Sequence, residues 1–296
     1  MIYSLAVLVV TSTYSDRIKV PTATQPEAGK PQPSLSLGSN MRYFFIEKPE
    51  REDSIFSITG SDARHIKTVL RMKPGDIIGL FDGKGFQYEA KIIDLSPERV
   101  QVSIIRRFPS TAESPLQIVV AQAFLKEKKM DGLVRQLSEL GIVKWIPFIA
   151  ERSVPRPDKK QLLARMKRWE KIAKEALKQC RRGRIMEINE TVSFEEMLNM
   201  GQFCDLKVAF WEDELQPVHA NLPGPNKQIN SVFAIIGPEG GFTQNEIEKA
   251  KDQGFVTVGL GPRILRSETA AVAACALFQY LFGDMGQKYL DKKREV

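Results

Sequence analysis

The chain has 296 residues, of which 43% are hydrophobic and 27% charged, and its net charge is +7. This composition predicts a globular protein with room for two domains, and the positive charge suits a polyanionic partner without requiring one. Its apolar runs are too short for the about 18 to 20 residues of a membrane span, and its 3 separated cysteines exclude a disulfide framework and a zinc motif.

Residues 1–40 predict no folded domain. An apolar run at residues 2–10 has no Lys or Arg before it and no clear cleavage site after it, which argues against a secretory signal. The three separated cysteines fit a protein of the reducing cytoplasm. Residues 11–40 are rich in Ser, Thr and Pro and show no apolar period. Met41 then begins an apolar strand, so the first 40 residues are either a disordered leader or an extension upstream of the true start.

Residues 41–110 are expected to form a small β-rich domain with one helix. Ser61 and Asp62 offer an N-cap, and Ile66, Val69 and Leu70 follow at helical spacing. Short apolar runs then alternate with Pro-Gly and Asp-Gly turn signals. Strands are predicted at residues 77–81, 86–93 and 100–105. Such closely spaced strands indicate a small barrel or a curled sheet.

A second domain is expected at residues 114–290, because strands and helices alternate beyond a linker at residues 108–115. Thr243 is expected to cap one of the helices, with Glu246 at the capping-box position. Strands are predicted at residues 116–124, 142–148, 206–211, 231–236 and 255–260, and helices at residues 130–140, 162–180, 244–254 and 269–282. This alternation predicts an α/β domain with a largely parallel sheet.

Two glycine-bearing loops, at residues 237–241 and 259–266, follow successive predicted strands of the second domain. We expect both loops at one edge of the sheet, where glycines let a ligand approach the backbone. A plain turn between strand and helix is the alternative for each loop. Neither loop has the phosphate-binding Walker pattern or the Gly-x-Gly-x-x-Gly pattern, so the residues alone predict a site for an unspecified ligand.

The two loops together resemble those of the SPOUT, or α/β-knot, superfamily of methyltransferases. Within it, residues 236–242 and 260–270 are similar to the family that methylates uridine N3 in 16S ribosomal RNA. Other blocks match that family in the same order over residues 41–290. They include His65, Arg71, Arg152 and Gln179.

This resemblance implies a PUA-like, RNA-binding β-barrel at residues 41–110 and an α/β domain with a trefoil knot at residues 114–290. It also implies S-adenosylmethionine as the cofactor, 16S ribosomal RNA of the small subunit as the substrate, and a homodimer without a metal or a membrane. The final helix carries apolar residues that suit either a dimer interface or the core of one chain. A methyltransferase with another RNA target and an inactive RNA-binding assembly factor are the alternatives.

The methyl donor is expected to bind at the two loops and the start of the final helix. Arg266 is the first candidate for stabilising an anionic uracil, since a guanidinium is always charged and pairs well with carbonyl oxygens, although it is also able to hold a phosphate. Glu239 and Glu268 are candidates for accepting the N3 proton or orienting the sugar of the donor. Alternatively, Glu239 locks its loop and Glu268 stabilises a helix start. The expected cofactor contacts are Phe210, Gly237, Pro238, Glu239, Gly240, Gly241, Leu260, Gly261, Ile264, Leu265, Arg266, Thr269 and Ala270.

RNA binding is expected on a basic surface around residues 159–184, where 11 Lys or Arg face two Glu. A solvated helix face is the alternative, but the arginines at its end suit phosphate contacts better than internal pairs. His65 has no partner at metal-ligand spacing. The predicted RNA contacts are Arg42, Arg64, His65, Arg71, Lys126, Lys128, Lys129, Arg152, Gln179, Arg181, Arg182 and Arg184.

Overall fold

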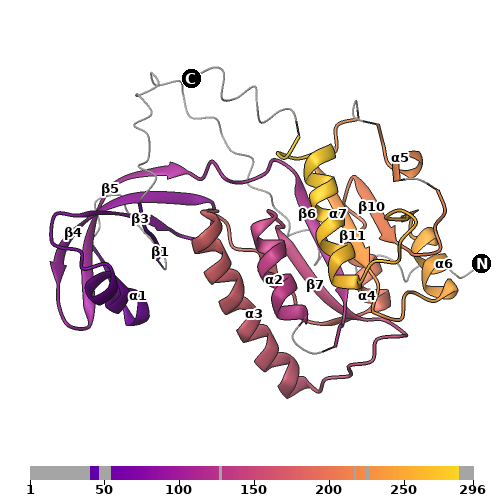
Figure 1. Cartoon of the computed structure of the whole chain (residues 1–296), viewed down its shortest axis with the longest axis horizontal. Coiled ribbons are helices and arrows are strands. Elements are labelled where there is room, and N and C mark those ends of the chain that lie inside the picture. Colours follow the sequence, from indigo (N-terminus) through magenta and orange to yellow (C-terminus); the bar gives the residue numbers. More distant parts are fainter. Residues whose placement is uncertain (1–40, 47–54, 127–128, 217, 225–226, 287–296) are drawn as a thin grey trace, which may run out of the picture. The chain divides into compact units, whose positions relative to one another are not determined.

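The computed structural model describes residues 41–46, 55–126, 129–216, 218–224 and 227–286, which Figure 1 draws in colour. These residues belong to one compact unit, Asn40–Val296. The predicted leader at residues 1–40 lies outside the described residues. Among the described helices, none is long and apolar enough to cross a membrane.

The first domain is a five-stranded sheet that wraps a small apolar core. Ile66, Ile78 and Ile92 are fully buried in that core. Register shifts along the β4·β5 pair break the ladder at two places, and such bulges bend and twist a sheet. The strands are β1 (Tyr43–Phe45), β2 (Ile55–Thr59), β3 (Ile77–Phe81), β4 (Phe86–Leu95) and β5 (Arg99–Pro109), in the order β1-β3-β4-β5-β2. The prediction of a curled β domain is confirmed.

The predicted helix of this domain is present, but its start differs from the prediction. Helix α1 (Gly60–Arg64) begins after Thr59 and has no side-chain cap, so Ser61 and Asp62 lie inside its first turn. The chain continues as a π-helix, His65–Val69, and then Arg71 adopts a positive φ of 52°. The predicted helix is therefore present, but its N-cap was placed two or three residues too late, and Val69 is 64% exposed whereas Ile66 is buried.

The second domain is a seven-stranded sheet in which every pair of strands is parallel. The order is β12-β10-β11-β6-β7-β8, with β9 on β7. The α/β fold with a parallel sheet is confirmed. The strands are β6 (Gln117–Ala123), β7 (Lys144–Ile149), β8 (Glu187–Ile188), β9 (Val192–Ser193), β10 (Leu206–Phe210), β11 (Ser231–Ile236) and β12 (Val256–Val258).

Helices cover both faces of this sheet (Figure 1). Neighbouring strand residues point to opposite faces, so Val120 joins the core under α2, α3 and α7, whereas Ala121 joins the core under α4 and α6. On the first face the rings of Trp145 and Trp169 meet edge to face, 4.9 Å between centroids. The helices are α2 (Lys129–Glu139), α3 (Lys159–Cys180), α4 (Phe194–Met200), α5 (Val218–Asn221), α6 (Gln244–Asp252) and α7 (Ser267–Leu281).

The starts of these helices show where local sequence signals were sufficient to predict a helix and its first residue. Thr243 caps α6, and its capping box with Glu246 is formed as predicted. Helix α7 starts at Ser267 rather than at residue 269, and α4 was not predicted. Ala271, Ala274 and Phe278 of α7 are fully buried inside this chain, so these three residues belong to the core and are not available for a dimer interface.

Candidate active site

A cavity of about 800 Å³ opens at the carboxyl ends of β10, β11 and β12. This volume suits a ligand of ordinary small-molecule size. Because β10 lies between β11 and β12, the two glycine-bearing loops are separated by a third loop, residues 211–216, which also lines the cavity. This third loop was not among the predicted parts of the site. The available signal was its position directly after a buried strand of a parallel sheet, since all such strands end at the same edge.

Most of the predicted cofactor contacts line this cavity, and two do not. Gly240 and Thr269 are absent from the lining, while Trp211 and Ser267 belong to it although they were not predicted. The predicted residues that line the cavity are Phe210, Gly237, Pro238, Glu239, Gly241, Leu260, Gly261, Ile264, Leu265, Arg266 and Ala270.

Gly241 shows why the first loop requires glycine. Its φ is +68°, which L side chains rarely adopt, and a β-carbon there would overlap the carboxylate of Glu212 in the third loop. Arg152 supports the same loop from outside, since its Nη1 donates to the carbonyl oxygens of Gly240 (3.0 Å) and Phe242 (3.4 Å). Arg152, which was predicted to contact RNA, therefore stabilises the first glycine-bearing loop through these hydrogen bonds.

Ser267 connects the first loop to the start of α7. Its hydroxyl donates to the carbonyl oxygen of Gly237. The buried amide of Gln122, at the end of β6, donates in turn to the Ser267 hydroxyl at 3.0 Å and to the carbonyl oxygen of Ala123 at 3.0 Å. Helix, loop and strand are thus joined behind the cavity wall.

The two candidate carboxylates have different surroundings. Oε1 of Glu239 accepts from the Lys126 amide and from Nζ of Lys129, each at 3.1 Å. Burial raises the pKa of Glu239, but these two donors outweigh it, so the pKa lies below its ordinary value. Glu268 has Oε1 3.6 Å from the same Lys129 nitrogen, whereas its Oε2 is buried and lacks a hydrogen-bond partner among the described residues. Lys129, predicted to contact RNA, instead lies between the two carboxylates.

Arg266 is exposed, lines the cavity and directly precedes α7. Within the described part of the chain, no hydrogen bond or ion pair engages its guanidinium. A permanently charged group at a cavity wall without an internal partner is available to a bound ligand.

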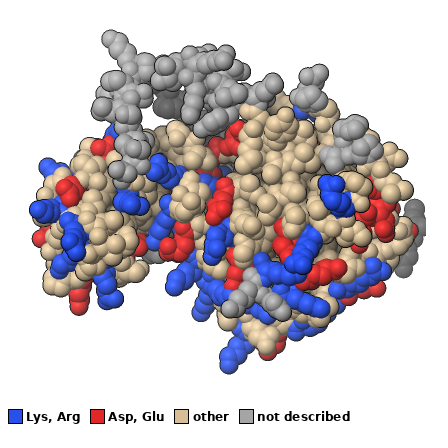
Figure 2. Space-filling view, in the orientation of Figure 1, with Lys and Arg blue, Asp and Glu red and all other residues tan. Residues whose placement is uncertain are grey.

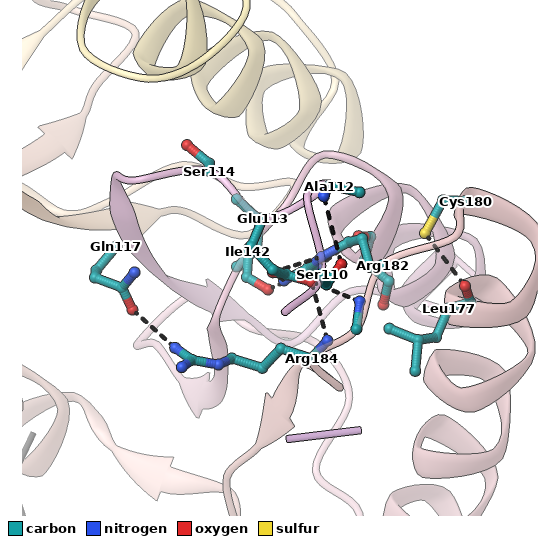
Figure 3. Close-up of polar contacts among 12 residues, drawn as sticks. Ser110, Ala112, Glu113, Ser114, Gln117, Ile142, Leu177, Cys180, Arg182 and Arg184 are labelled. Atoms are coloured by element: carbon teal, nitrogen blue, oxygen red, sulfur yellow. Dashed lines mark hydrogen bonds and ion pairs between the residues drawn. The ribbon is translucent and has the colours of Figure 1, made fainter. Parts of the chain in front are cut away.

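Arg182 corrects the predicted RNA surface. Its side chain is 2% exposed, and its Nη1 donates to the carbonyl oxygens of Ser138 (2.7 Å) and Ile142 (3.1 Å). Its Nη2 lies 2.9 Å from Oε2 of Glu113, whose Oε1 accepts from the Gly183 amide (Figure 3). Arg182 is a structural residue, because its side chain is almost fully buried and four of its five N–H donors are engaged inside the protein.

Other predicted RNA contacts are on the surface. Figure 2 shows Lys and Arg over the first domain and along α3 on the face drawn. Lys128 lies outside the described residues. The exposed residues of the predicted set, besides those already placed, are Arg42, Arg64, His65, Arg71, Lys126, Gln179, Arg181 and Arg184.

Comparison with protein families gives two matches. Residues 58–105 match the family described as RNA methyltransferase PUA domain. Residues 112–279 match the family described as RNA methyltransferase domain. The residues that line the cavity all lie within this part of the chain.

Individual proteins resemble the chain over most of its length. Ribosomal RNA small subunit methyltransferase E of Bacillus subtilis is 34% identical over 251 residues, covering 81% of this chain and 96% of that protein. The protein of the same name from Neisseria gonorrhoeae, crystallised with S-adenosyl methionine, is 30% identical with a TM-score of 0.73, covering 83% of this chain and 99% of that one. A Legionella pneumophila protein in complex with the cofactor SAM is also 30% identical, with a TM-score of 0.75 and the same coverage.

Proposed function

The chain belongs to the ribosomal RNA small subunit methyltransferase E family, and from that premise we propose that it transfers a methyl group from S-adenosylmethionine to uridine N3 in 16S ribosomal RNA. The observation that carries the proposal is the cavity at the ends of three parallel strands, lined by both glycine-bearing loops and by Arg266. The Neisseria and Legionella relatives, each 30% identical to this chain, hold the same methyl donor.

The residues present fit this cofactor. Gly241 keeps the loop backbone free of a side chain at the cavity wall, while Phe210, Leu260 and Ala270 offer apolar surface. Trp211 also lines the cavity, and its buried Nε1 has no hydrogen-bond partner among the described residues, so a donor is available to a bound ligand. When bound, S-adenosylmethionine supplies an electrophilic methyl group on a sulfonium.

Residues of the chain must stabilise the charge that develops on the uracil and accept the N3 proton. Uracil N3 becomes a nucleophile only as its proton leaves, so negative charge develops on the base oxygens during the reaction. Arg266 is positioned to stabilise that charge, because its guanidinium lines the cavity and is permanently positive. Glu239 is a poor proton acceptor, since the Lys126 amide and Lys129 stabilise its ionised form and hold its pKa low.

RNA is proposed to lie on the basic surface outside the cavity. Arg64 and Arg71 belong to the PUA domain, and Arg181 and Arg184 follow α3. All four are exposed, and exposed Arg side chains attract a phosphate backbone. A homodimer, implied by family resemblance, would use exposed apolar residues such as Tyr280 (63% exposed) instead of the buried face of α7.

The deciding experiment is methylation in vitro. Purified protein, labelled S-adenosylmethionine and small ribosomal subunits that lack the modification should yield label at N3 of a uridine. Label at a ribose or at another base would overturn the N3 assignment, and label only in a different RNA would indicate another target. Calorimetry that detects no donor binding, even with RNA present, would favour an inactive assembly factor.

A further inference from the structure

Glu212, in the third loop, is a cavity-lining carboxylate whose side chain is exposed. No hydrogen bond or ion pair joins it to another residue of the described chain. Its two acidic neighbours differ from it. Asp213 is exposed but does not line the cavity, and both oxygens of Glu214 are engaged, since Oε2 accepts from the Thr257 hydroxyl at 2.6 Å and Oε1 from the Gln216 amide at 3.0 Å. In this loop, Glu212 therefore has the carboxylate that is available to a ligand.

The position of Glu212 is set by the strand before it and by the first glycine-bearing loop. β10 pairs in parallel with β11, and Phe210 at the end of β10 lies opposite Ile236 at the end of β11. Glu212 and the first glycine-bearing loop therefore leave the sheet at the same edge. There the Glu212 carboxylate packs against Gly241, at the place where a β-carbon would stand. Because Gly241 and Glu212 both line the cavity, a ligand that approaches the loop backbone also meets this carboxylate.

The chemistry of a carboxylate limits what Glu212 can bind. An ionised carboxylate only accepts hydrogen bonds, and it is costly to remove its water unless the ligand supplies donors in exchange. The ribose of S-adenosylmethionine has two neighbouring hydroxyls, which offer one donor to each oxygen of a single carboxylate. In other parallel α/β sheets, an acidic residue that accompanies a glycine-rich loop at the strand ends binds a ribose hydroxyl of the cofactor. The ribose is therefore the part of the donor that suits Glu212 best.

We propose that Glu212 determines specificity for the nucleoside part of the methyl donor, with its carboxylate accepting hydrogen bonds from the ribose hydroxyls. This inference rests on the proposed function. It gives Glu212 a role in binding and none in the transfer of the methyl group or of the N3 proton. Loss of the contact should therefore raise the KM for the donor and leave the rate at saturating donor unchanged.

The test measures by calorimetry how tightly wild type and Glu212→Gln bind S-adenosylhomocysteine, which keeps the ribose and the ammonium group. Replacing a charged acceptor by a neutral amide should weaken binding by about tenfold or more. The dideoxy derivative of this ligand lacks both ribose hydroxyls, so its affinity should be the same for the two proteins. Methylthioadenosine keeps the ribose but lacks the ammonium group, and it should show the full loss.

Asp213→Asn is the matched control, because it removes the same charge from the adjacent position, where the side chain does not line the cavity. That variant should bind each ligand as wild type does. Equal losses in Asp213→Asn and Glu212→Gln would indicate a general effect of loop charge and would overturn the inference. Since Glu212 is exposed, Glu212→Gln should also unfold at the wild-type urea concentration, and a lower midpoint would point to a structural role instead.

The ligand series separates the ribose from the other donor groups of the cofactor. Unchanged affinity of Glu212→Gln for S-adenosylhomocysteine would overturn the inference. A loss that persists with the dideoxy derivative, or one that vanishes with methylthioadenosine, would do so as well, because the carboxylate would then contact a group other than the ribose. A wild-type protein that binds none of these ligands would instead overturn the proposed function itself.

Discussion

Gly259 packs so closely against Glu214 that a β-carbon on the glycine would overlap the carbonyl oxygen of Glu214. Gly259 follows β12 and Glu214 belongs to the loop after β10, so this contact sets the spacing between two walls of the cavity. Glu214 is itself anchored, because the hydroxyl of Thr257 donates to its Oε2 at 2.6 Å. The loop cannot give way without losing that hydrogen bond.

Gly259→Ala should therefore weaken donor binding by about tenfold or more, since a shift of the third loop changes the cavity that surrounds the ligand. Calorimetry with S-adenosylmethionine measures this effect. Gly132→Ala is the matched control: no atom lies within 4 Å of its added β-carbon, and Gly132 is inside α2. That variant should keep its affinity and gain about 0.5 to 1 kcal/mol in the free energy of unfolding. Unchanged donor affinity in Gly259→Ala would contradict the spacing role.

Arg266→Ala should reduce the methylation rate by about 10² to 10³-fold while RNA and donor still bind, because the lost charge acts mainly on the anionic uracil of the transition state. Single-turnover rates and separate binding measurements distinguish these effects. Arg266→Lys keeps the charge but not the planar fork, so it should fall between wild type and Arg266→Ala. An unchanged rate in Arg266→Ala would refute the catalytic role.

The stability that Glu239 contributes should depend on pH. Burial raises its pKa, but the Lys126 amide and Lys129 lower it further, to below the ordinary value of 4.5. A carboxyl group with a lowered pKa in the folded state stabilises the protein fully above its unfolded pKa and loses that contribution as pH falls through the folded pKa. In urea unfolding, wild type should exceed Glu239→Gln most above pH 4.5, and the difference should shrink in acid. A difference that grows toward acid pH would contradict this assignment.

Arg182→Met and Arg184→Ala should separate a structural arginine from an RNA-binding one. Arg182→Met removes the guanidinium that pairs with Oε2 of Glu113 and donates to two carbonyl groups, so the free energy of unfolding should fall by about 3 to 5 kcal/mol. The exposed Arg184 should change stability by no more than about 0.5 kcal/mol, but its removal should lower the salt slope of RNA binding by about one. Urea unfolding measures the free energy of unfolding of each variant, and RNA titration at several salt concentrations measures the salt slope. If Arg182→Met kept its stability but lowered the salt slope of RNA binding, the structural role would be wrong and the predicted RNA contact of Arg182 would be supported.

Short-range features of this protein were predictable from its sequence. The strands Ile77–Phe81 and Ser231–Ile236 have the predicted bounds, and the capping box of Thr243 and Glu246 forms as expected. Apolar periodicity and capping act within a few residues, so the chain itself contains the whole signal. Helix α4 was missed because it is short and lies between brief β9 and β10 strands, where periodicity over one or two turns is a weak signal.

The arginines after α3 show where this local information ends. Arg181, Arg182 and Arg184 form one charge run in sequence, and all three were predicted to contact RNA. Arg181 takes a left-handed conformation, with φ of 61°, and this reversal turns Arg182 toward Glu113. Glu113 is 69 residues away along the chain. Only the folded chain therefore separates the buried charge from the exposed ones.

By itself, the sequence determined the two domains, the parallel sheet, both glycine-bearing loops and the charge of each candidate residue. The tertiary structure decided the strand order, which places β10 and the loop after it between the two glycine-bearing loops. It also decided which group pairs with each charged side chain. Lys129 meets Glu239 across 110 residues of chain. A residue's charge is a local property, whereas the group that balances it is chosen by packing between elements that are remote in sequence.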